Sequence, residues 1–434
     1  MSGMLIRPAK ALRGEIPLAG DKSISHRAAI LSAMAVGETR IDNFAESQDC
    51  RSTLECLRRL RVEIGRDGRA IVVRGVGKSG FLGPDIPLDC GNSGTTMRLL
   101  AGVLAGQSFD SVLTGDDSLC RRPMNRVIEP LEAMGAVIGS DNGNAPLDIH
   151  GRRPLAATHH RLKIASAQIK SCILLAGLNS DGETSVTERI ATRDHTERML
   201  RWFGVDVDEK KTDEGTTLSV NGKSLLSARD IRVPSDISSA VFFMVAAACL
   251  AGSDISIPGV GLNPTRSDVI GTLQHAGALI SLENEREQSN EPVGDIRVSG
   301  GLTADGKNVI NGDAIAGLID ELPALAVLGT QLQAGLEVRD AGELRVKESD
   351  RIAAIVENLR RMGANVEEFD DGFRVRRSHL TGARVESFGD HRIAMAFAVA
   401  GLLAEGETEI DGAECAAVSF PGFFDVLENV AIYE

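Results

Sequence analysis

The sequence has few aromatic residues, few positive charges relative to negative ones, and no long apolar run. Aromatic residues make up 3% of the 434 residues, with one Trp and one Tyr, which argues against aromatic platforms that stack nucleic-acid bases. The formal net charge is -14 at pH 7, which is unfavourable for a general binder of phosphate backbones. The longest apolar run extends from Ala240 to Gly252 and is shorter than the ~20 residues that cross a bilayer. We therefore expect a protein that binds neither nucleic acid nor membranes.

Common cofactor and metal motifs are also missing. No GxxxxGK[ST] sequence occurs, and the one GxGxxG match, "GVGKSG" from Gly75 to Gly80, is a weak signal by itself, so an ATP or dinucleotide site is unsupported. The eight histidines show no metal-ligand spacing, either among themselves or with cysteines. The seven cysteines form no CxxC pair, which is typical of reduced thiols, and the first ten residues lack the apolar core of a signal peptide. These absences predict a cytoplasmic protein with no cofactor and no metal.

What the sequence does contain is one pattern that occurs six times. A polar or charged opening precedes an apolar run of small residues, then a glycine, then a short β-like segment. The openings begin at Lys22, Ser93, Ser166, Ser235, Asp320 and Asp390. The closing glycines recur at intervals of roughly 70 to 80 residues, which is typical of a repeated supersecondary unit. Between them lie amphipathic segments such as "LRRLRVEI" and "LEAMGAVI". Each repeat therefore predicts helix, turn, strand, helix and strand, followed by a further strand.

Six repeats divide naturally into three and three. The stretch from Ser224 to Pro234 separates the third repeat from the fourth. The lead strand "MLIRPAK" has no partner in the first repeat, so we place it with the second half. The predicted first domain is therefore 20–232, and the second is 1–19 plus 233–434, with the chain crossing twice. We expect the two domains to face one another across a cleft and to close when the first ligand binds.

The openings of the repeats combine helix ends with charged side chains. The first helix of each repeat is apolar all round and should be buried, and its N-terminus attracts anions. Charged residues near these openings are Lys22, Arg27, Arg193, Asp320 and Arg392. Two further clusters are "CRRPMNR", with Arg121 and Arg122, and "ELRVKESDR", with Lys347, Glu348 and Arg351. Such arginines suit carboxylate and phosphate groups.

Each of these residues also has a plainer interpretation. A single Arg or Lys is more often a solvated surface charge. Asp320 is equally well explained as the N-cap of the helix that follows it, and Glu348 as one half of a surface ion pair. His391, alone, is more often a structural hydrogen-bonding group than a catalyst. The two carboxylates could instead act as acid and base in a basic cleft.

The motifs resemble those of one family. "GDKSISHR", "GNSGTTMR", "RRP", "SAQ", "RDHTE", "NPTR", "RVKESDR" and "DHRIAM" occur in the order found in the 5-enolpyruvylshikimate-3-phosphate synthase family, and "SAQIK" and "RDHTE" resemble its second class. The resemblance covers essentially the whole chain. It implies an α/β fold, a two-domain inside-out α/β barrel with six repeats of a βαβαββ unit, three per domain. It also implies transfer of the enolpyruvyl group of phosphoenolpyruvate to the 5-hydroxyl of shikimate 3-phosphate, with release of phosphate, by addition and elimination through a tetrahedral intermediate.

The resemblance also assigns the site residues, with these two anions as partners. We expect a monomer, although the sequence itself says little about oligomeric state. The residues implied for shikimate 3-phosphate are Ser23, Arg27, Ser166, Gln168, Arg193 and Lys347, with Lys22 touching both substrates. Those implied for phosphoenolpyruvate are Gly94, Arg122, Gln168, Arg351 and Arg392. Asp320 would take the proton of the attacking hydroxyl. Glu348, with Lys22, would move protons at the methylene carbon and the leaving phosphate, and His391 would orient Glu348.

Three positions depart from the family pattern, and two other functions remain open. Ala167 stands where some members have a second serine, Glu343 where some have asparagine, and Val418 where others have a lysine. The first alternative is a UDP-N-acetylglucosamine enolpyruvyl transferase, which has the same fold and uses a cysteine before an Arg-Pro pair, as Cys120 stands before "RRP" here. That spacing is too short. The second is a non-catalytic anion-binding scaffold, which would not need Asp320 or Glu348.

Overall fold

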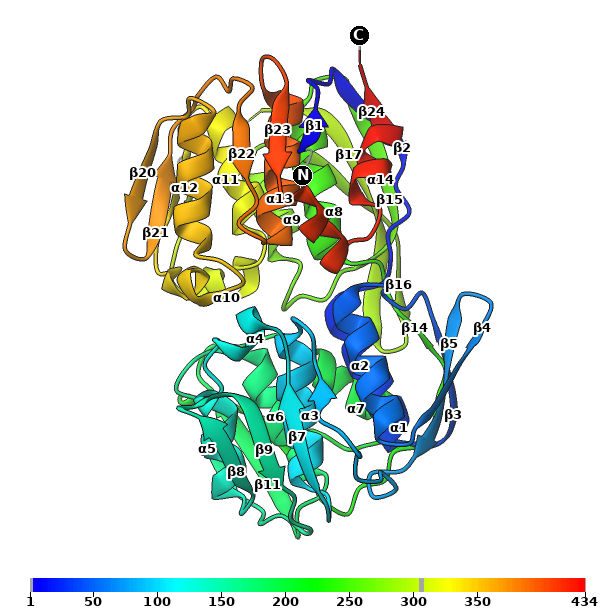
Figure 1. The fold of residues 1–434 in the computed structure, drawn as a ribbon. Helices are drawn as coiled ribbons and strands as arrows, with labels where there is room; N and C mark the ends of the chain where they lie inside the picture. Colours follow the sequence, from blue (N-terminus) through cyan, green and yellow to red (C-terminus); the bar gives the residue numbers. More distant parts are fainter. Residues whose placement is uncertain (1–2, 304–307, 434) are drawn as a thin grey trace. The chain divides into compact units, whose positions relative to one another are not determined.

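The computed structural model describes residues 3–303 and 308–433, and the chain divides into two compact units. Unit 1 contains Met1–Ala19, Pro234–Glu287 and Pro292–Glu434; unit 2 contains Gly20–Val233 and Gln288–Glu291. The short return to unit 2 at Gln288–Glu291 is the turn of a long hairpin, which the sequence pattern does not predict. Residues 1–2, 304–307 and 434 of the predicted second domain lie outside the described residues. Figure 1 draws unit 2 mainly in blue to green.

Unit 2 contains the first three repeats, each with a buried helix, an amphipathic helix and a sheet. The buried helices are α1 (Lys22–Met34), α3 (Gly94–Ala105) and α6 (Ala167–Gly177); the others are α2 (Gln48–Arg59), α4 (Asp117–Cys120), α5 (Asn125–Ala133) and α7 (His195–Trp202). The first sheet has the order β14 (Ile231–Arg232), β3 (Val36–Asp42), β5 (Ala70–Val76) and β4 (Glu63–Asp67). The second is β6 (Leu88–Asp89), β7 (Asp110–Thr114), β9 (Asn144–His150) and β8 (Val137–Asp141). The third is β10 (His159–Arg161), β11 (Glu183–Glu188), β13 (Gly215–Asn221) and β12 (Asp208–Thr212).

The three sheets of unit 2 share one topology. In each, the first strand runs parallel to the second, and the remaining pairs are antiparallel. Strand β14 ends the third repeat and pairs with β3 of the first repeat. Because of this pairing, the three repeats close on themselves within unit 2.

Unit 1 repeats this plan with the N-terminal segment included. Its buried helices are α8 (Ile237–Cys249), α11 (Leu322–Gln331) and α13 (His391–Leu403); the others are α9 (Asp268–His275), α10 (Ala314–Leu318), α12 (Arg351–Arg361), α14 (Phe423–Val430) and the 3-10 helices η1 (Gly342–Val346) and η2 (Ala413–Val418). Its first sheet is β16 (Ala278–Gln288), β17 (Glu291–Leu302), β15 (Asp254–Gly261), β2 (Ala11–Glu15) and β24 (Ala431–Ile432). The others are β18 (Asn308–Ile310), β19 (Leu336–Val338), β21 (Gly372–Val375) and β20 (Val366–Phe369), and then β1 (Met4–Ile6), β23 (Thr408–Asp411) and β22 (Arg384–Glu386).

The lead strand pairs within unit 1. Strand β1 runs antiparallel to β23, and β2 runs parallel to β15. The sixth repeat ends in α14 and β24, and β24 pairs with β2. The six-repeat α/β architecture predicted from the sequence is therefore confirmed, with the N-terminal strands completing unit 1.

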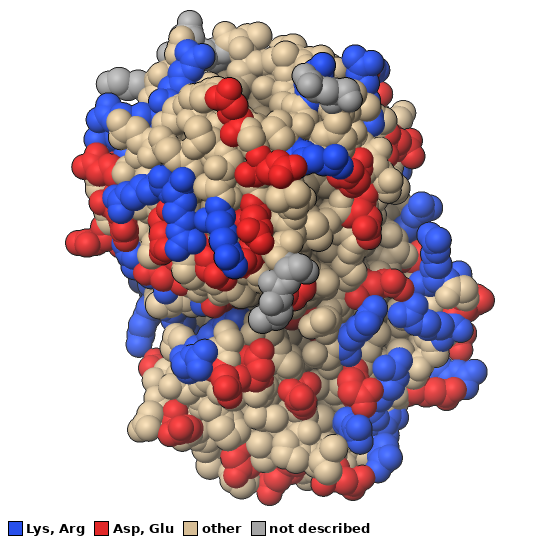
Figure 2. All heavy atoms as spheres, turned by 45° about the horizontal axis from the view of Figure 1, so that its top comes forward, with Lys and Arg blue, Asp and Glu red and all other residues tan. Residues whose placement is uncertain are grey.

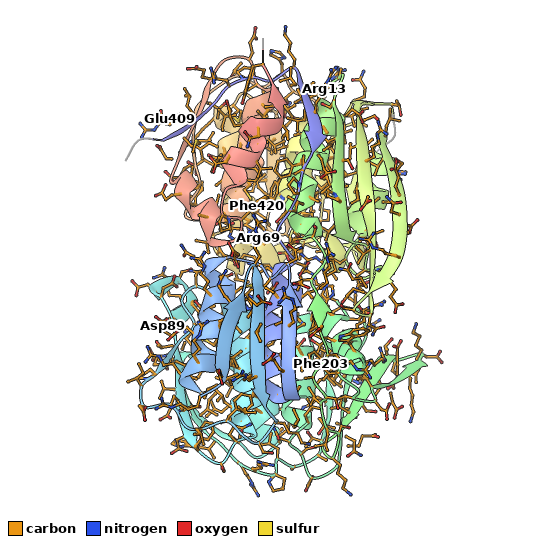
Figure 3. All side chains as sticks on the ribbon, turned by 90° about the vertical axis from the view of Figure 1, so that its right-hand side faces the viewer. Arg13, Arg69, Asp89, Phe203, Glu409 and Phe420 are labelled. Atoms are coloured by element: carbon orange, nitrogen blue, oxygen red, sulfur yellow. The ribbon has the colours of Figure 1, made fainter. Side chains whose placement is uncertain are left out.

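Each unit has its own apolar core around its buried helices. In unit 1 an aromatic group adds to the core, where the rings of Phe243 and Phe423 lie 5.5 Å apart and those of Phe420 and Phe423 also 5.5 Å apart. Phe203 is fully buried in the core of unit 2. Figure 3 labels Phe203 and Phe420 among the side chains of the two units. The all-apolar character of the first helices is explained by this burial from all sides.

Side chains cap five of the six buried helices. The caps are Asp21, Ser93, Ser166, Asp236 and Asp390, each accepting a hydrogen bond from a backbone N–H of the first turn. The exception is α11, whose N-cap position is Glu321 with no side-chain cap bond. Asp320 lies one residue before that position, so the interpretation of Asp320 as the cap of this helix is wrong.

The surface carries both signs of charge. On the face shown in Figure 2, Lys and Arg side chains lie next to Asp and Glu side chains over both units. Many charged side chains of the described residues form exposed ion pairs, such as Arg297 with Asp254 at 2.8 Å. Such pairs contribute little to stability. Among the described residues, no helix is long and apolar enough to cross a membrane.

Candidate active site

In unit 2, the start of α1 carries three of the predicted substrate residues. The Lys22 ammonium lies 3.0 Å from the Asp49 carboxylate of α2, and both side chains are largely buried. Arg27 donates from Nε to Thr196 Oγ1 at 2.7 Å and from Nη2 to Ser171 Oγ at 2.9 Å. Its Nη1 donates to the backbone oxygen of Ser23, one turn back, at 2.9 Å. These contacts hold the side chains of Lys22 and Arg27 in place in the first two turns of α1.

The start of α3 brings Gly94 close to two arginines. A methyl group added at Gly94 would lie 2.7 Å from Arg98 Nη1 and 3.4 Å from Arg122 Nη1, so the absence of a side chain leaves room beside both guanidinium groups. Arg122 donates to Asn92 Oδ1 at 2.7 Å. Arg122 was predicted from the sequence, whereas Arg98, the last residue of "GNSGTTMR", was not.

The start of α6 places Gln168 against the same arginine. Arg98 Nη1 donates to Gln168 Oε1 at 2.7 Å, and Gln168 Nε2 donates to Thr95 Oγ1 at 2.9 Å. The carboxamide of Gln168 is therefore held at both ends. Ser166 caps the helix through the N–H of Ile169 at 3.4 Å. Gln168 is thus hydrogen-bonded to Arg98, and Gly94 lies beside both Arg98 and Arg122.

Arg193 and the departure at Ala167 also belong to unit 2. Arg193 is partly exposed in the loop between β11 and α7. Ala167 is the first residue of α6, so in place of a hydroxyl only backbone and a methyl group are available there.

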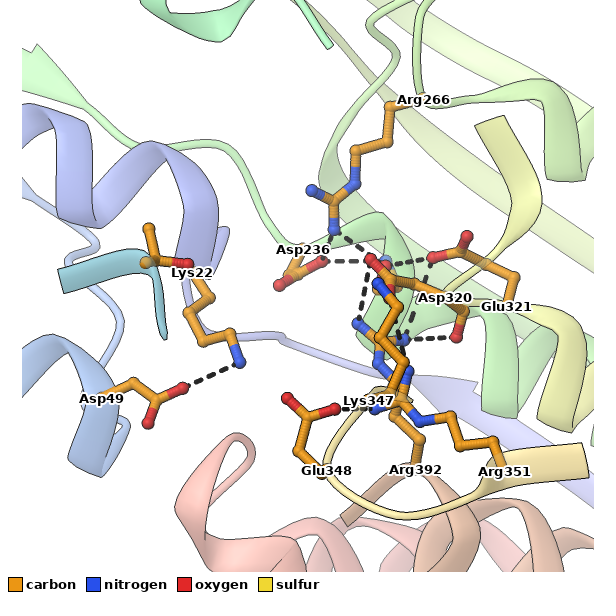
Figure 4. Close-up of polar contacts among 12 residues, drawn as sticks. Lys22, Asp49, Asp236, Arg266, Asp320, Glu321, Lys347, Glu348, Arg351 and Arg392 are labelled. Atoms are coloured by element: carbon orange, nitrogen blue, oxygen red, sulfur yellow. Dashed lines mark hydrogen bonds and ion pairs between the residues drawn. The ribbon is translucent and has the colours of Figure 1, made fainter. Parts of the chain in front are cut away.

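In unit 1, Arg351 is the centre of a buried ion network. Its Nε donates to Asp390 Oδ2 at 2.7 Å, and its Nη2 donates to Glu348 Oε2 at 2.7 Å. Its Nη1 lies 3.5 Å from Asp320 Oδ1. The side chains of Arg351 and Asp390 are 1% and 0% exposed. Figure 4 shows the side chains of Lys347, Arg351 and Arg392 close to Asp320, with Glu348 bound to Arg351.

The network also shifts the proton affinities of its members. Burial by itself would lower the pKa of Arg351, but the Asp390 and Glu348 carboxylates raise it overall. Burial would raise the pKa of Asp390, but Arg351 lowers it overall. Both groups therefore stay charged, because each stabilises the charged form of the other.

Asp320 is surrounded by three cationic groups of unit 1. Besides Arg351, Lys347 Nζ lies 3.8 Å from Asp320 Oδ1 and Arg392 Nη2 lies 3.9 Å from Asp320 Oδ2. Arg392 Nη1 donates to the backbone oxygen of Asp320 at 2.6 Å. The side chain of Asp320 is 16% exposed, against 1% for that of Arg351. An accessible carboxylate among cations can accept a proton from a hydroxyl of an anionic ligand that those cations bind.

His391 is the first residue of α13 and is 5% exposed. Its neighbour Asp390 joins the network through Arg351, which also binds Glu348. The orientation of Glu348 by His391 stays a prediction. Glu343 lies in η1 and Val418 is the last residue of η2, both partly exposed.

Several partners were not predicted from the sequence. Asp49 binds Lys22, Asp390 binds Arg351, and Glu321 lies 3.9 Å from Arg392 Nη1. Asp390 and Glu321 each adjoin an assigned residue, which was the available signal; Asp49 had none. Among the described residues, no group of three or more His, Cys, Asp or Glu is arranged to hold a metal ion.

Comparisons with known proteins agree with one another. The family model described as EPSP synthase (3-phosphoshikimate 1-carboxyvinyltransferase) matches residues 6–427. A 3-phosphoshikimate 1-carboxyvinyltransferase of Pelotomaculum thermopropionicum is 54% identical over 430 residues, which cover 98% of each chain. One from Solibacter usitatus is 49% identical over 428 residues, covering 98% of this chain and 99% of the relative. The solved structure of EPSP synthase from Acinetobacter baumannii has 42% identity and a TM-score of 0.88, and covers 100% of this chain and 99% of that chain. The chain described here belongs to the EPSP synthase family.

Proposed function

We propose that this chain transfers the enolpyruvyl group of phosphoenolpyruvate to the 5-hydroxyl of shikimate 3-phosphate and releases phosphate. Membership of the EPSP synthase family supports this activity, which belongs to the shikimate pathway of aromatic amino acid biosynthesis. The observation that carries the proposal is the carboxylate of Asp320 within 3.5 to 3.9 Å of three cationic groups. Both substrates are anions that arginine and lysine suit, and the reaction needs a base beside them.

The substrate roles follow the family pattern. Ser23, Arg27, Ser166, Gln168, Arg193 and Lys347 are proposed to bind shikimate 3-phosphate, and Gly94, Arg122, Gln168, Arg351 and Arg392 to bind phosphoenolpyruvate, with Lys22 touching both. The anchored carboxamide of Gln168 and the open space beside Gly94 support these assignments. Arg351 is the least accessible of the set. Since Asp390, Glu348 and Asp320 already surround it, direct contact with a ligand requires one of these partners to move.

The reaction needs proton transfers in both of its stages, the addition and the elimination. Asp320 takes the proton of the 5-hydroxyl as its oxygen attacks the central carbon of phosphoenolpyruvate. Glu348, with Lys22, protonates the methylene carbon, which gives a tetrahedral adduct. In the elimination the same two groups take one proton back from the new methyl group and pass a proton to the phosphate oxygen as its bond to carbon breaks, which restores the double bond. The bond of Glu348 to Arg351, 2.7 Å long, supports a fixed position for this carboxylate.

We also propose a cytoplasmic enzyme that works as a monomer without cofactor or metal. The length of the family match supports a chain that carries all its own site residues. Light scattering of the purified protein tests the monomeric state, since the mass of a dimer would contradict it.

Phosphate release is the experiment that tests the proposed function. The purified protein is given phosphoenolpyruvate with shikimate 3-phosphate, and separately with UDP-N-acetylglucosamine. Release with shikimate 3-phosphate alone is expected. Release with UDP-N-acetylglucosamine alone would favour a UDP-N-acetylglucosamine enolpyruvyl transferase. Release with neither would favour a non-catalytic anion-binding scaffold.

A further inference from the structure

Two quoted motifs end in residues that the proposed reaction does not use. Lys170 is the last residue of "SAQIK" and Glu197 the last of "RDHTE". In unit 2 they meet: Lys170 Nζ on α6 lies 2.7 Å from Glu197 Oε1 on α7, and each side chain is 1% exposed. Two motifs separated in the sequence are therefore joined by one buried ion pair.

A third residue completes this cluster, which we call the Lys170 triad (Lys170, Glu188 and Glu197). Lys170 Nζ donates to Glu188 Oε1 at 2.9 Å, and Glu188 is the last residue of β11. The same nitrogen donates to the backbone oxygen of Thr192 at 3.3 Å, while Thr192 Oγ1 donates to Glu188 Oε2 at 2.6 Å. Lys170 thus donates hydrogen bonds to Glu188 and to the backbone of Thr192, and its contact with Glu197 is an ion pair.

The triad lies directly behind residues assigned to shikimate 3-phosphate. Thr192, which both Lys170 and Glu188 hold, immediately precedes Arg193 in the loop between β11 and α7. Lys170 follows Gln168 by two residues on α6. The residues adjacent to Lys170 and Glu197 on the two helices, Ser171 and Thr196, bind Arg27. The triad and its neighbours therefore connect α1, α6, α7 and the Arg193 loop.

The charges of the triad are unfavourable for stability alone. One ammonium and two carboxyl groups are buried, so the cluster carries a surplus of acid. Burial raises the pKa of Glu197 even though Lys170 opposes this. Burial would lower the pKa of Lys170, but Glu197 and Glu188 raise it overall. Well-packed apolar side chains are commonly as stable as a buried ion network, so the orientation that these bonds impose is the effect that apolar groups would not supply.

We propose that Lys170, Glu188 and Glu197 are positioning residues that hold the Arg193 loop and the start of α6 in the geometry that binds shikimate 3-phosphate. This inference rests on the proposed function. The triad touches no substrate; it acts through Thr192 on Arg193 and through α6 on Gln168 and Ser166.

The test measures the dissociation constant of shikimate 3-phosphate by calorimetry and the KM of each substrate by phosphate release. In Lys170→Met, loss of the bonds to Thr192 and the carboxylates should raise the dissociation constant at least about tenfold, with a smaller change in the KM for phosphoenolpyruvate. The matched control is Lys163→Met, because Lys163 is 85% exposed and 3.3 Å from Glu129. The double variant Lys170→Met/Glu197→Gln should recover part of the lost affinity, because it removes one unbalanced acid.

Thr192→Val keeps the inference testable if Lys170→Met does not fold. It removes one hydrogen bond to Glu188 with little change in volume, and should weaken shikimate 3-phosphate binding several-fold, on the order of one hydrogen bond. Unchanged affinity in folded Lys170→Met, or in Thr192→Val, would overturn the inference while the wild type remains active. A wild type that releases no phosphate with shikimate 3-phosphate would overturn the proposed function, and the inference with it.

Discussion

Replacement of Asp320 by asparagine separates catalysis from binding. The change keeps the shape of the side chain and removes a negative charge that lies 3.5 Å from Arg351, 3.8 Å from Lys347 and 3.9 Å from Arg392. If Asp320 accepts the proton of the attacking hydroxyl, kcat should fall at least ~100-fold, or about 2.7 kcal/mol of transition-state stabilisation. The proton then has no acceptor of suitable basicity at that position.

The same change should affect substrate binding much less. Loss of one hydrogen bond to the hydroxyl weakens binding by about 1 kcal/mol, roughly fivefold. Removal of a carboxylate from among three cations acts in the opposite direction, because the cluster becomes more positive toward anions. We therefore expect the dissociation constants of both substrates to stay within about fivefold of the wild type, as measured by calorimetry.

Asp313→Asn is the matched control for this experiment. Asp313 belongs to the same unit, is exposed, and makes no cap bond to α10, so its turnover should equal that of the wild type. Near-normal turnover of Asp320→Asn would refute the base role and leave Asp320 as an electrostatic partner of its three cations. A parallel loss of affinity for both anions would refute the separation of the two effects.

Three further changes test other parts of the structure. Arg122→Ala, which loses the guanidinium beside Gly94, should raise the KM for phosphoenolpyruvate at least about tenfold; an unchanged KM would remove Arg122 from the site. Cys120→Ser should retain activity with shikimate 3-phosphate, since the thiol lies 3.4 Å from the backbone oxygen of Gly115, whereas abolished turnover would make Cys120 a reacting group. Burial lowers the pKa of His26 from 6.5 to about 3, so the unfolded chain binds more protons and the free energy of unfolding should fall as pH drops through this range. His26→Asn removes the titrating imidazole, whose Nδ1 is hydrogen-bonded to Thr53 Oγ1. The free energy of unfolding from urea titrations should then fall less steeply with decreasing pH than in the wild type. Equal slopes for the two proteins would contradict this reasoning.

The repeat pattern was sufficient to predict the architecture, because burial of each first helix demands apolar residues on every face. The same logic located Lys22, Arg392 and Asp320 at helix openings. It did not predict that Asp320 stops short of the cap position of α11. The turn between α10 and α11 decides that point, and the composition of "DELPALAVL" is compatible with either start.

The pairing of charges was beyond the sequence for a different reason. Asp390 and Asp320 reach Arg351 from separate segments of the chain, and their meeting depends on how the fifth and sixth repeats pack around the buried helices, whereas Glu348 lies only three residues before Arg351. A single sequence gives no direct measure of that packing. Arg98 illustrates the same limit in unit 2, because its bond to Gln168 joins two repeats.

Lys170 is a buried charge for which the sequence did carry a signal. It lies in "AQIKSCILLAG", a helix otherwise without charge, so an all-round buried helix places its ammonium in the core whichever way it faces. A buried ammonium requires acidic partners. Among the acidic residues of the same repeat, the structure pairs Lys170 with Glu188, the last residue of β11, and with Glu197, in the first turn of α7. A charged residue inside an otherwise apolar repeat helix therefore predicts a buried ion network. The segment bound to that network is a candidate for a functional loop.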